Sequence, residues 1–364
     1  MPGNSIGEYY QLTSFGESHG DAIGGVIDGC PAGLHLSVEA IQQELARRRP
    51  GYSPFSTTRK ESDQLQLLSG LFQGVTTGMP IGFLVYNQDK NSSDYEEIKH
   101  LFRPSHADYS WQVKYGIRDY RGGGRSSARE HVSRVVAGAV AKQCLGLKNI
   151  TLEAYTSRIG MVEIGCSPRG WDIAYGREHP LGCPDREKGE QMVALIRRLQ
   201  EEGDSVGGVV SCIIRGVPAG VGEPVFHRFQ ARLAHYMMGI NAAKGFEYGE
   251  GFHAATMRGS EHNDPFYSHD GKIRTATNHS GGVQGGVTNG EDIFFRVAFK
   301  PVPTIAMEQQ TVTTGGDPAR IKATGRHDPC VIPRVLPVVE AMAAMLVLDM
   351  MLEGGFFPRK INEK

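Results

Sequence analysis

The grouping of the glycines is the feature of this sequence that most constrains its fold. The chain has 47 glycines among 364 residues, close to twice the usual share of ~7%. Clustered glycine marks tight turns, or places where the backbone must approach a ligand closely. The glycines are concentrated in short groups rather than spread along a flexible linker: Gly122-Gly123-Gly124, Gly207-Gly208, Gly281-Gly282, Gly285-Gly286 and Gly315-Gly316.

Between these loops the sequence predicts a mixture of helices and strands. Apolar positions at helical spacing predict helices at residues 37–49, 127–145, 188–202, 225–243 and 336–352. Residues 127–130 also fit a capping box. Strand-like runs occur at residues 81–86, 207–215 and 292–299. Because no regular βαβ rhythm and no long linker are present, we expect an α+β fold in a single domain over residues 1–364, with a flexible tail from about residue 354.

Composition narrows the class of protein. Hydrophobic residues make up 40% and charged residues 22% of the chain, which is ordinary for a globular protein with a sizeable core. The formal net charge of -1 argues against a dedicated nucleic-acid binder, since such proteins usually carry a basic excess. The apolar stretch at 338–352 contains Glu340 and Asp349 and is shorter than the ~20 residues that cross a bilayer. We interpret it as a buried helix and expect no membrane association.

The cysteines and the N-terminus indicate the compartment. The six cysteines include no Cys-x-x-Cys pair and are too sparse for a disulfide scaffold, which favours a reducing environment. Residues 1–10 show no basic segment followed by an apolar one, so no signal peptide is predicted. We therefore expect a cytoplasmic protein.

The segment at 16–20 is the first that could carry chemistry. His19 lies between glycines, where the backbone can adopt unusual geometry, and an imidazole can exchange a proton near neutral pH. A lone pair such as Ser18 and His19 is more often structural than functional. It could also belong to a hydrolase nucleophile, but the chain has no Gly-x-Ser-x-Gly elbow here.

A second segment, at 118–130, combines four arginines with three consecutive glycines. Glycine brings backbone N–H groups close to a ligand, and the start of the following helix carries partial positive charge. Arginine offers paired donors that match phosphate or carboxylate. The alternative is a solvated basic stretch, which the capping signal after the glycines argues against.

Two further segments contain histidine. In residues 103–108 the proline would help to fix His106, which is as consistent with a satisfied polar residue as with an acid or base. Residues 325–330 contain a cation, an imidazole and a carboxylate before the last long helix, although a capping loop with a local salt bridge would have the same composition. The histidines lack His-x-x-x-His and His-Glu-x-x-His spacing, so we predict no metal site. The residues by themselves thus indicate arginine and glycine loops suited to a phosphorylated anion, with histidines for proton transfer.

Taken together and in this order, the segments resemble the chorismate synthase family. The resemblance runs from about residue 5 to residue 350, and the ordered set is far more specific than any single motif. It rests on the stretches at 15–21 (FGESHGD), 28–33 (DGCPAG), 102–108 (FRPSHAD), 120–130 (YRGGGRSSARE), 203–208 (GDSVGG), 217–224 (VPAGVGEP), 278–286 (NHSGGVQGG) and 325–330 (GRHDPC).

The resemblance implies a fold and a reaction. The family's fold is a single-domain β-α-β sandwich with antiparallel sheets, assembled as a homotetramer. Its reaction is a trans-1,4 elimination of phosphate from 5-enolpyruvylshikimate-3-phosphate that gives chorismate and needs reduced FMN although it is redox-neutral overall. Some members reduce the flavin with NADPH and others depend on a separate flavin reductase; the absence of a nicotinamide fingerprint here favours the second kind.

The resemblance also implies roles for particular residues. His19 would protonate the departing phosphate, His106 would stabilise negative charge on reduced FMN, and Asp328, with Ser18 and Ser127 as relays, would manage the proton at flavin nitrogen 5. Substrate contacts would come from Arg48, Arg129 and Arg326. Flavin contacts would come from Arg125, Ser126, Ser127, Asn241, Ala242, Gly285, Lys300, Pro301, Val302, Pro303, Thr304 and Arg326, with Lys300 suited to the FMN phosphate.

One position departs from the family pattern, and two other functions compete with this prediction. Many members carry a second arginine where this chain has Pro54, although Arg59 lies nearby, so a weaker or a rearranged phosphate clamp is expected. A flavin-independent phosphate-ester lyase or hydrolase would be active without reductant. An RNA-binding module built on the Arg-Gly stretch would show salt-sensitive binding, but the net charge and the lack of an aromatic-basic motif argue against it.

Overall fold

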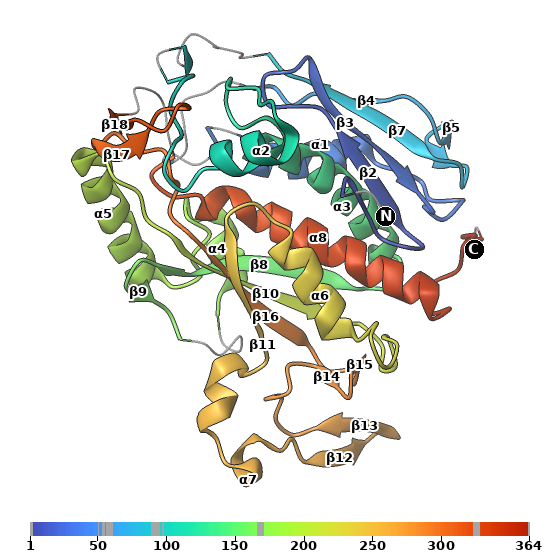
Figure 1. Ribbon diagram of the computed structural model, residues 1–364. Helices are drawn as coiled ribbons and strands as arrows, with labels where there is room; N and C mark the ends of the chain where they lie inside the picture. The colour runs from blue at the N-terminus through green and yellow to red at the C-terminus, as the bar shows by residue number, and fades with distance from the viewer. Residues whose placement is uncertain are drawn as a thin grey trace.

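A helical layer between two antiparallel sheets organises the chain (Figure 1). The computed structural model describes residues 3–49, 51–52, 55, 61–88, 95–96, 98–165, 171–322 and 328–362. Helix α8 (Ile332–Glu353) crosses the centre, packed against α3 (His131–Gly146), and both helices contact α1 (Val38–Arg48). This arrangement agrees with the predicted α+β class and β-α-β sandwich.

The N-terminal sheet has the order β1-β2-β3-β7-β4. Its side chains alternate between the two faces: in β7, Ile81, Phe83 and Val85 are buried and the residues between them are more exposed. The buried face lies on α3. The strands are β1 (Ser5–Ile6), β2 (Gln11–Phe15), β3 (Ala22–Asp28), β4 (Leu65–Leu67) and β7 (Ile81–Tyr86).

The second sheet has the order β11-β16-β10-β8-β9 and packs on α8. Strand β16 alternates without a break, with Ile293, Phe295, Val297 and Phe299 buried, because its other face is partly exposed. The predicted strands are confirmed to within one residue. The members are β8 (Thr151–Ile159), β9 (Val162–Glu163), β10 (Gly208–Arg215), β11 (Ala243–Tyr248) and β16 (Ile293–Phe299).

Shorter elements surround this sandwich. The remaining helices are α2 (Asp108–Tyr115), α4 (Ile173–Glu178), α5 (Arg186–Glu202), α6 (Phe229–Met238) and α7 (Gly259–His262), with 3-10 turns η2 (Gly124–Ser126), η3 (Ala128–Glu130) and η4 (Gly251–Thr256). Four two-stranded ribbons pair β5 (Leu71–Phe72) with β6 (Val75–Thr76), β12 (Phe266–His269) with β13 (Lys272–Thr275), β14 (Val283–Gln284) with β15 (Val287–Thr288), and β17 (Gln309–Val312) with β18 (Pro318–Ile321).

Two predicted helices differ from the observed ones. The helix expected at 225–243 is limited to α6, because Gly239 ends it and Ala242, with φ of +69°, turns the chain into β11. The helix expected from 127 begins as the 3-10 turn η3. Ser127 caps it through the N–H of Arg129, but the Glu130 carboxylate pairs with Arg134 at 2.6 Å, so the reciprocal half of the capping box gives way to an ion pair.

Helix α8 is longer than expected but buried, as predicted. Its 22 residues are numerous and apolar enough to cross a membrane, yet its most apolar 18-residue stretch is entirely buried inside the protein. The two acidic groups in its interior, Glu340 and Asp349, are satisfied there. Glu340 accepts from Arg47, Lys142 and the backbone of β8, and the Asp349 carboxylate accepts N–H groups of residues 8–10. The helix is therefore the core of the sandwich.

The segment that follows α8, expected to be a flexible tail, makes ordered contacts. Phe357 is buried, and its N–H donates to Met351 O at 3.0 Å. The backbone of Ala32 donates to Arg359 O at 3.0 Å and accepts from the N–H of Ile361 at 2.8 Å. Residues 354–362 therefore dock on the N-terminal sheet region.

Candidate functional site

The loop that follows β2 carries His19. Gly16 makes the turn with φ of +96°, and a Cβ there would lie 2.1 Å from Ala22 O, so only glycine fits. His19 is buried, and so is Ser18, whose Oγ has no hydrogen-bond partner among the described residues. An unsatisfied buried hydroxyl is unusual. Ser18 Oγ can thus donate to or accept from a ligand.

The glycine loop at 122–124 packs on this histidine. Gly122 has φ of +73°, and a Cβ there would lie 2.7 Å from His19 Cδ2 and 2.9 Å from Ser18 Oγ. The sequence predicts that the glycine backbone approaches a ligand closely. In the structure the Gly122 backbone instead closely approaches the loop that contains Ser18 and His19. Tyr95 closes the other side, with its ring centroid 5.3 Å from that of His19.

Two buried arginines lie next to this loop. Arg129 donates through Nη1 to Asp63, and Arg48, which is 1% exposed, holds Nη2 3.5 Å from the same carboxylate. Neither Nε nor Nη2 of Arg48 has a hydrogen-bond partner among the described residues. Burial lowers the pKa of Arg48 to about 9, and Arg334 and Arg129 add to this, although Asp63 opposes it. Arg48 therefore has free N–H groups in a buried, cation-rich place.

Asp63 is the counter-ion of both arginines. Burial by itself would raise the pKa of Asp63, but Arg48 and Arg129 outweigh burial and hold it below its ordinary value. Glu61 adds a weaker contact, 3.7 Å from Arg129. The sequence analysis did not identify these carboxylates, because no local pattern connects them to arginines far along the chain.

Asn87 joins the arginines to the histidine loop. Its Nδ2 donates to Glu17 O at 3.0 Å and Gly20 O at 2.9 Å, and its Oδ1 accepts from Arg129 Nε at 2.6 Å. One amide thus fixes both ends of the His19 turn against the Arg129 side chain. Sequence analysis missed Asn87 as well, since an asparagine after a strand is a common turn residue.

Asp328 lies at the start of α8 beside a residue that the sequence analysis did not select. Arg334 Nη1 donates to Asp328 Oδ2 at 2.5 Å, and Arg334 Nε donates weakly to Arg48 O at 3.5 Å. Arg334 therefore places Asp328 next to the C-terminal end of α1, which is the residue Arg48 with its buried side chain.

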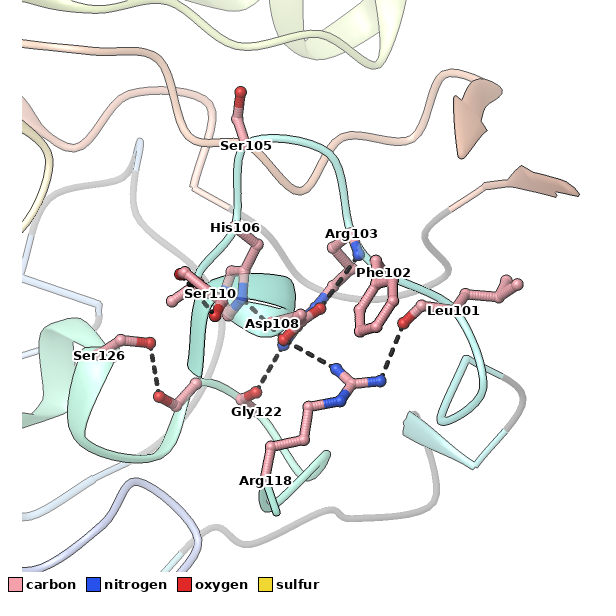
Figure 2. A network of polar contacts seen from close by, with 12 residues as sticks. Leu101, Phe102, Arg103, Ser105, His106, Asp108, Ser110, Arg118, Gly122 and Ser126 are labelled. Carbon is pink, nitrogen blue, oxygen red and sulfur yellow. Dashed lines mark hydrogen bonds and ion pairs between the residues drawn. The ribbon is translucent and has the colours of Figure 1, made fainter. Parts of the chain in front are cut away.

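The segment before α2 forms a second centre around Asp108 (Figure 2). Asp108 accepts from Arg103 at 2.7 and 2.8 Å and from the imidazole of His106 at 2.9 Å, and Arg118 lies 3.0 Å away. Burial alone would raise the pKa of Asp108, but the bonds from Arg103 and His106 outweigh it and hold the pKa far below its ordinary value. Arg103 also donates to Gly122 O at 2.7 Å, which connects this centre to the His19 loop.

The arginine and serines of 125–127 hold the loops to one another. Arg125 donates to Ser14 Oγ at 2.7 Å and to Gly16 O at 3.3 Å, so it fastens the start of the His19 turn. Ser126 O accepts from Asn241 Nδ2 at 2.7 Å, which attaches the loop to the end of α6.

Lys300 follows β16 and reaches the second centre. Its Nζ donates to Ser105 O at 2.6 Å, and its backbone N–H donates to Ala242 O at 3.0 Å. Burial lowers the pKa of Lys300, and Lys244 adds to the effect. No carboxylate among the described residues pairs with the Lys300 amine. The segment continues to Val302, whose carbonyl accepts from Ser205 at 2.8 Å.

Most of the predicted site residues thus connect through direct contacts, but Gly285 does not join them. Gly285 lies in the turn between β14 and β15. The carbonyl of its neighbour Gly286 accepts a hydrogen bond from the N–H of Phe229, so this turn lies at the first residue of α6. Asn241, in contrast, follows the C-terminal end of α6. The 10 residues of α6 separate the two ends by roughly 15 Å. Arg326, Pro54 and Arg59 lie outside the described residues.

A separate group contains donors of the kind that bind metals. Oxygen or nitrogen atoms of Glu8, His227 and Glu353 lie within 4.8 Å of one another. Arg232 donates to Glu353 at 2.7 Å and lies 3.8 Å from Glu8, so a guanidinium already partners these carboxylates. The contacts of this group with one another and with Arg232 involve none of the predicted site residues.

The chemistry available at the site follows from these contacts. Buried guanidinium groups with spare N–H donors can hold an anion strongly, because little water competes for them. Two imidazoles and a buried hydroxyl stand beside them for proton transfer. A partly desolvated lysine without a carboxylate partner can hold a second anionic group.

Comparisons with known proteins are consistent with this geometry. The family model described as chorismate synthase matches residues 10–352. The protein named chorismate synthase from Phocaeicola vulgatus is 56% identical over 346 residues, covering 95% of this chain and 97% of its own. The one from Parabacteroides distasonis is 55% identical over 349 residues, covering 96% and 98%.

A solved structure is similar along the same length. The "Crystal Structure of Chorismate Synthase" aligns with a TM-score of 0.77 at 31% identity, covering 96% of this chain and 93% of that one. The similarity therefore extends over both sheets and the helical layer.

Proposed function

Because the chain belongs to the chorismate synthase family, we propose that it eliminates phosphate from 5-enolpyruvylshikimate-3-phosphate with reduced FMN to give chorismate. The observation that carries the proposal is the pair of buried arginines, Arg48 and Arg129, beside the His19 loop. Within the described part of the chain, Nε and Nη2 of Arg48 make no hydrogen bond there. A buried cation of this kind is costly to maintain unless an anion completes it.

The substrate supplies suitable anions. Its phosphate and carboxylates would accept from Arg48, Arg129 and, outside the described residues, Arg326. His19 would give its proton to the phosphate oxygen that leaves the ring, because a protonated oxygen is the better leaving group. Gly122 and Tyr95 both pack against the imidazole of His19, and such shielding from water strengthens the electrostatic interactions in the site.

The residues present fit an FMN group. Lys300, an amine with no carboxylate partner among the described residues, would hold its phosphate, and Pro301, Val302, Pro303 and Thr304 would line the same side. Arg125, Ser126, Ser127, Asn241 and Ala242 would provide further contacts, and a hydrogen bond from Asn241 to Ser126 O holds two of them together. When bound, reduced FMN supplies electron density to the substrate as phosphate leaves.

Proton management would fall to two residues. His106 would face the flavin ring and balance negative charge there. Asp328, which Arg334 holds at 2.5 Å, would manage the proton at flavin nitrogen 5, with Ser18 and Ser127 as relays. The buried Ser18 hydroxyl has spare hydrogen-bonding capacity for this task.

The proposal extends to assembly and supply. We place the enzyme in the cytoplasm as a homotetramer that receives reduced flavin from a separate reductase rather than from NADPH bound to this chain. Within one chain Gly285 lies at the opposite end of α6 from Asn241. In a tetramer, Gly285 of one subunit would instead contact the flavin that another subunit holds.

An anaerobic assay tests the function. Purified protein is mixed with 5-enolpyruvylshikimate-3-phosphate and dithionite-reduced FMN, and chorismate absorbance and phosphate release are followed together. Parallel reactions contain oxidised FMN or no flavin. We expect chorismate and phosphate in equal amounts, with reduced flavin only. Phosphate release without flavin would instead establish a flavin-independent lyase or hydrolase, and folded protein that makes no product with reduced FMN would contradict the proposal.

A further inference from the structure

We propose that Asp108 is the positioning residue of His106: its carboxylate accepts a hydrogen bond from Nδ1–H and so presents Nε2 to the ligand. The inference deepens the proposed function and rests on it, because there His106 lies beside reduced FMN. It concerns a residue without a role in the prediction from sequence, which named only His106 in this segment.

The geometry supports a specific pair. Asp108 Oδ1 lies 2.9 Å from His106 Nδ1, within ordinary hydrogen-bonding distance. The bond connects two residues of one tight turn, because His106 N–H donates to Arg103 O at 3.1 Å and Ser105 has φ of +56°. Lys300 holds the same turn from outside through Ser105 O. The ring therefore has little freedom to leave the carboxylate.

The charge of Asp108 decides which nitrogen carries the proton. Arg103 donates to both carboxylate oxygens, and Arg118 Nη1 lies 3.0 Å from Oδ1 (Figure 2). Asp108 is buried and remains ionised under these cations. An ionised carboxylate can only accept hydrogen bonds, so His106 Nδ1 must be the donor. In the neutral ring Nε2 is then the acceptor, and it is the nitrogen that can take a proton where negative charge develops.

The same carboxylate connects the two histidines of the site. Arg103, fixed by Asp108, donates to Gly122 O at 2.7 Å, and Gly122 packs on His19. The Arg103 guanidinium also lies 5.7 Å from the ring centre of Tyr95, which contacts His19 from the other side. Loss of Asp108 would therefore loosen the support of His19 as well as the orientation of His106.

A purely structural role for Asp108 must be distinguished from this one. Asp108 is the first residue of α2 and anchors two arginines, so its replacement could lower activity by loosening the loop alone. The tautomer of His106 separates the two roles, because a structural anchor has no reason to select one ring nitrogen.

The test is a long-range proton–nitrogen NMR experiment on protein labelled with nitrogen-15 histidine, run over a pH series. His106 is assigned by its absence in His106→Asn. We expect His106 to carry its proton on Nδ1 in the wild type and to move toward the Nε2–H form in Asp108→Asn. That variant should retain its fold by circular dichroism. Its kcat should fall about 10- to 100-fold, the usual effect of losing a group that orients another, with KM for the substrate changed less than about threefold.

Asp270→Asn is the matched control. It removes the same charge from another aspartate beside a histidine, His269 at 3.4 Å, on the exposed β12–β13 turn. It should leave both the His106 tautomer and kcat unchanged.

Three results would overturn the inference: a wild-type His106 protonated on Nε2, an unchanged tautomer in Asp108→Asn, or an unchanged kcat in a variant whose tautomer has switched. The first needs no variant, so the test survives if Asp108→Asn does not fold. Wild-type protein that makes no chorismate would instead contradict the proposed function, and the NMR result would remain as a separate measurement of the pair.

Discussion

Arg48 is a residue that lowers the stability of the fold and at the same time provides N–H donors for an anion. Its guanidinium is almost fully buried, yet among the described residues it has only a 3.5 Å contact with Asp63 and a weak hydrogen bond that it donates to Arg129 O at 3.5 Å. Two further arginines raise the local positive potential, and the pKa of Arg48 falls to about 9. Such an arrangement lowers stability, which is typical of a binding site that awaits an anion.

Arg48→Ala should weaken substrate binding much more than flavin binding. Removal of one partner of a buried charge pair costs about 2–5 kcal/mol, so we expect at least about 30-fold weaker substrate binding. The affinity for FMN should change less than about threefold. Isothermal titration with substrate, and separately with FMN, measures both without turnover.

Arg49→Ala provides the control for this experiment. Arg49 is the exposed neighbour at the end of α1, so its loss should change neither affinity. Equal losses for substrate and flavin in Arg48→Ala would contradict the assignment of Arg48 to the substrate.

At the scale of elements, the crossing of α3 and α8 sets the thickness of the sandwich. Gly138 faces Ala341 at this crossing, and a Cβ on Gly138 would lie 2.2 Å from the Ala341 Cβ and 2.3 Å from its Cα. The absence of a side chain lets the two backbones approach closely.

Gly138→Ala should therefore destabilise the protein even though alanine favours helix. Overpacking against backbone atoms lowers stability by about 1–3 kcal/mol. Replacing glycine with alanine inside a helix raises stability by at most about 1 kcal/mol, so the loss is expected to exceed the gain. The urea midpoint at neutral pH measures the change.

Gly146→Ala lies in the same helix and offers the matched comparison. No atom lies within 4 Å of a Cβ placed there, so this variant should be as stable as the wild type or slightly more stable. A Gly138→Ala variant as stable as Gly146→Ala would show that the two helices can move apart at no cost.

At the scale of the whole molecule, Glu340 joins layers that are distant in sequence. It lies inside α8 and receives Arg47 from α1 at 2.7 Å, Lys142 from α3 at 2.5 Å and the N–H of Ala154 from β8 at 2.9 Å. Burial alone would raise the pKa of Glu340, but these partners lower it far below the ordinary 4.5. The carboxylate therefore binds the helical layer to the second sheet only while ionised.

The sign of the pH dependence follows from that shift. A folded-state pKa below the unfolded value contributes stability that is present above about pH 4.5 and is lost as the pH falls toward the folded pKa. Asp63 and Asp108, whose pKa values are also lowered, contribute with the same sign. The free energy of unfolding should therefore decline as the pH falls below about 4.5.

Glu340→Gln isolates this contribution. The variant leaves buried cations without their anion, so it should be about 3–5 kcal/mol less stable at neutral pH. The difference from the wild type should shrink as the pH falls below about 4.5. Urea midpoints between pH 7 and pH 3 measure it. Glu308→Gln, which disturbs an exposed pair with Arg320, should match the wild type throughout, and a Glu340→Gln difference independent of pH would contradict the explanation.

The sequence by itself determined the features that depend on neighbours along the chain. The alternation in β16 and β7, the serine that starts α1, and the apolar run of α8 all follow from short-range patterns, and the observed elements agree closely with them. The motifs also identified the family, because their order and spacing are specific even where each motif is weak.

Only the tertiary structure decided which groups meet. Asp63 reaches Arg129 across 66 residues, Asn87 reaches the same arginine across 42, and Arg334 reaches Arg48 across 286. Such pairs leave no periodic signal, because they arise from how the sheets and helices pack. For the same reason α6 ends early where β11 must pair with β16. Local propensity is overridden wherever a buried charge or a strand partner offers a larger gain in free energy.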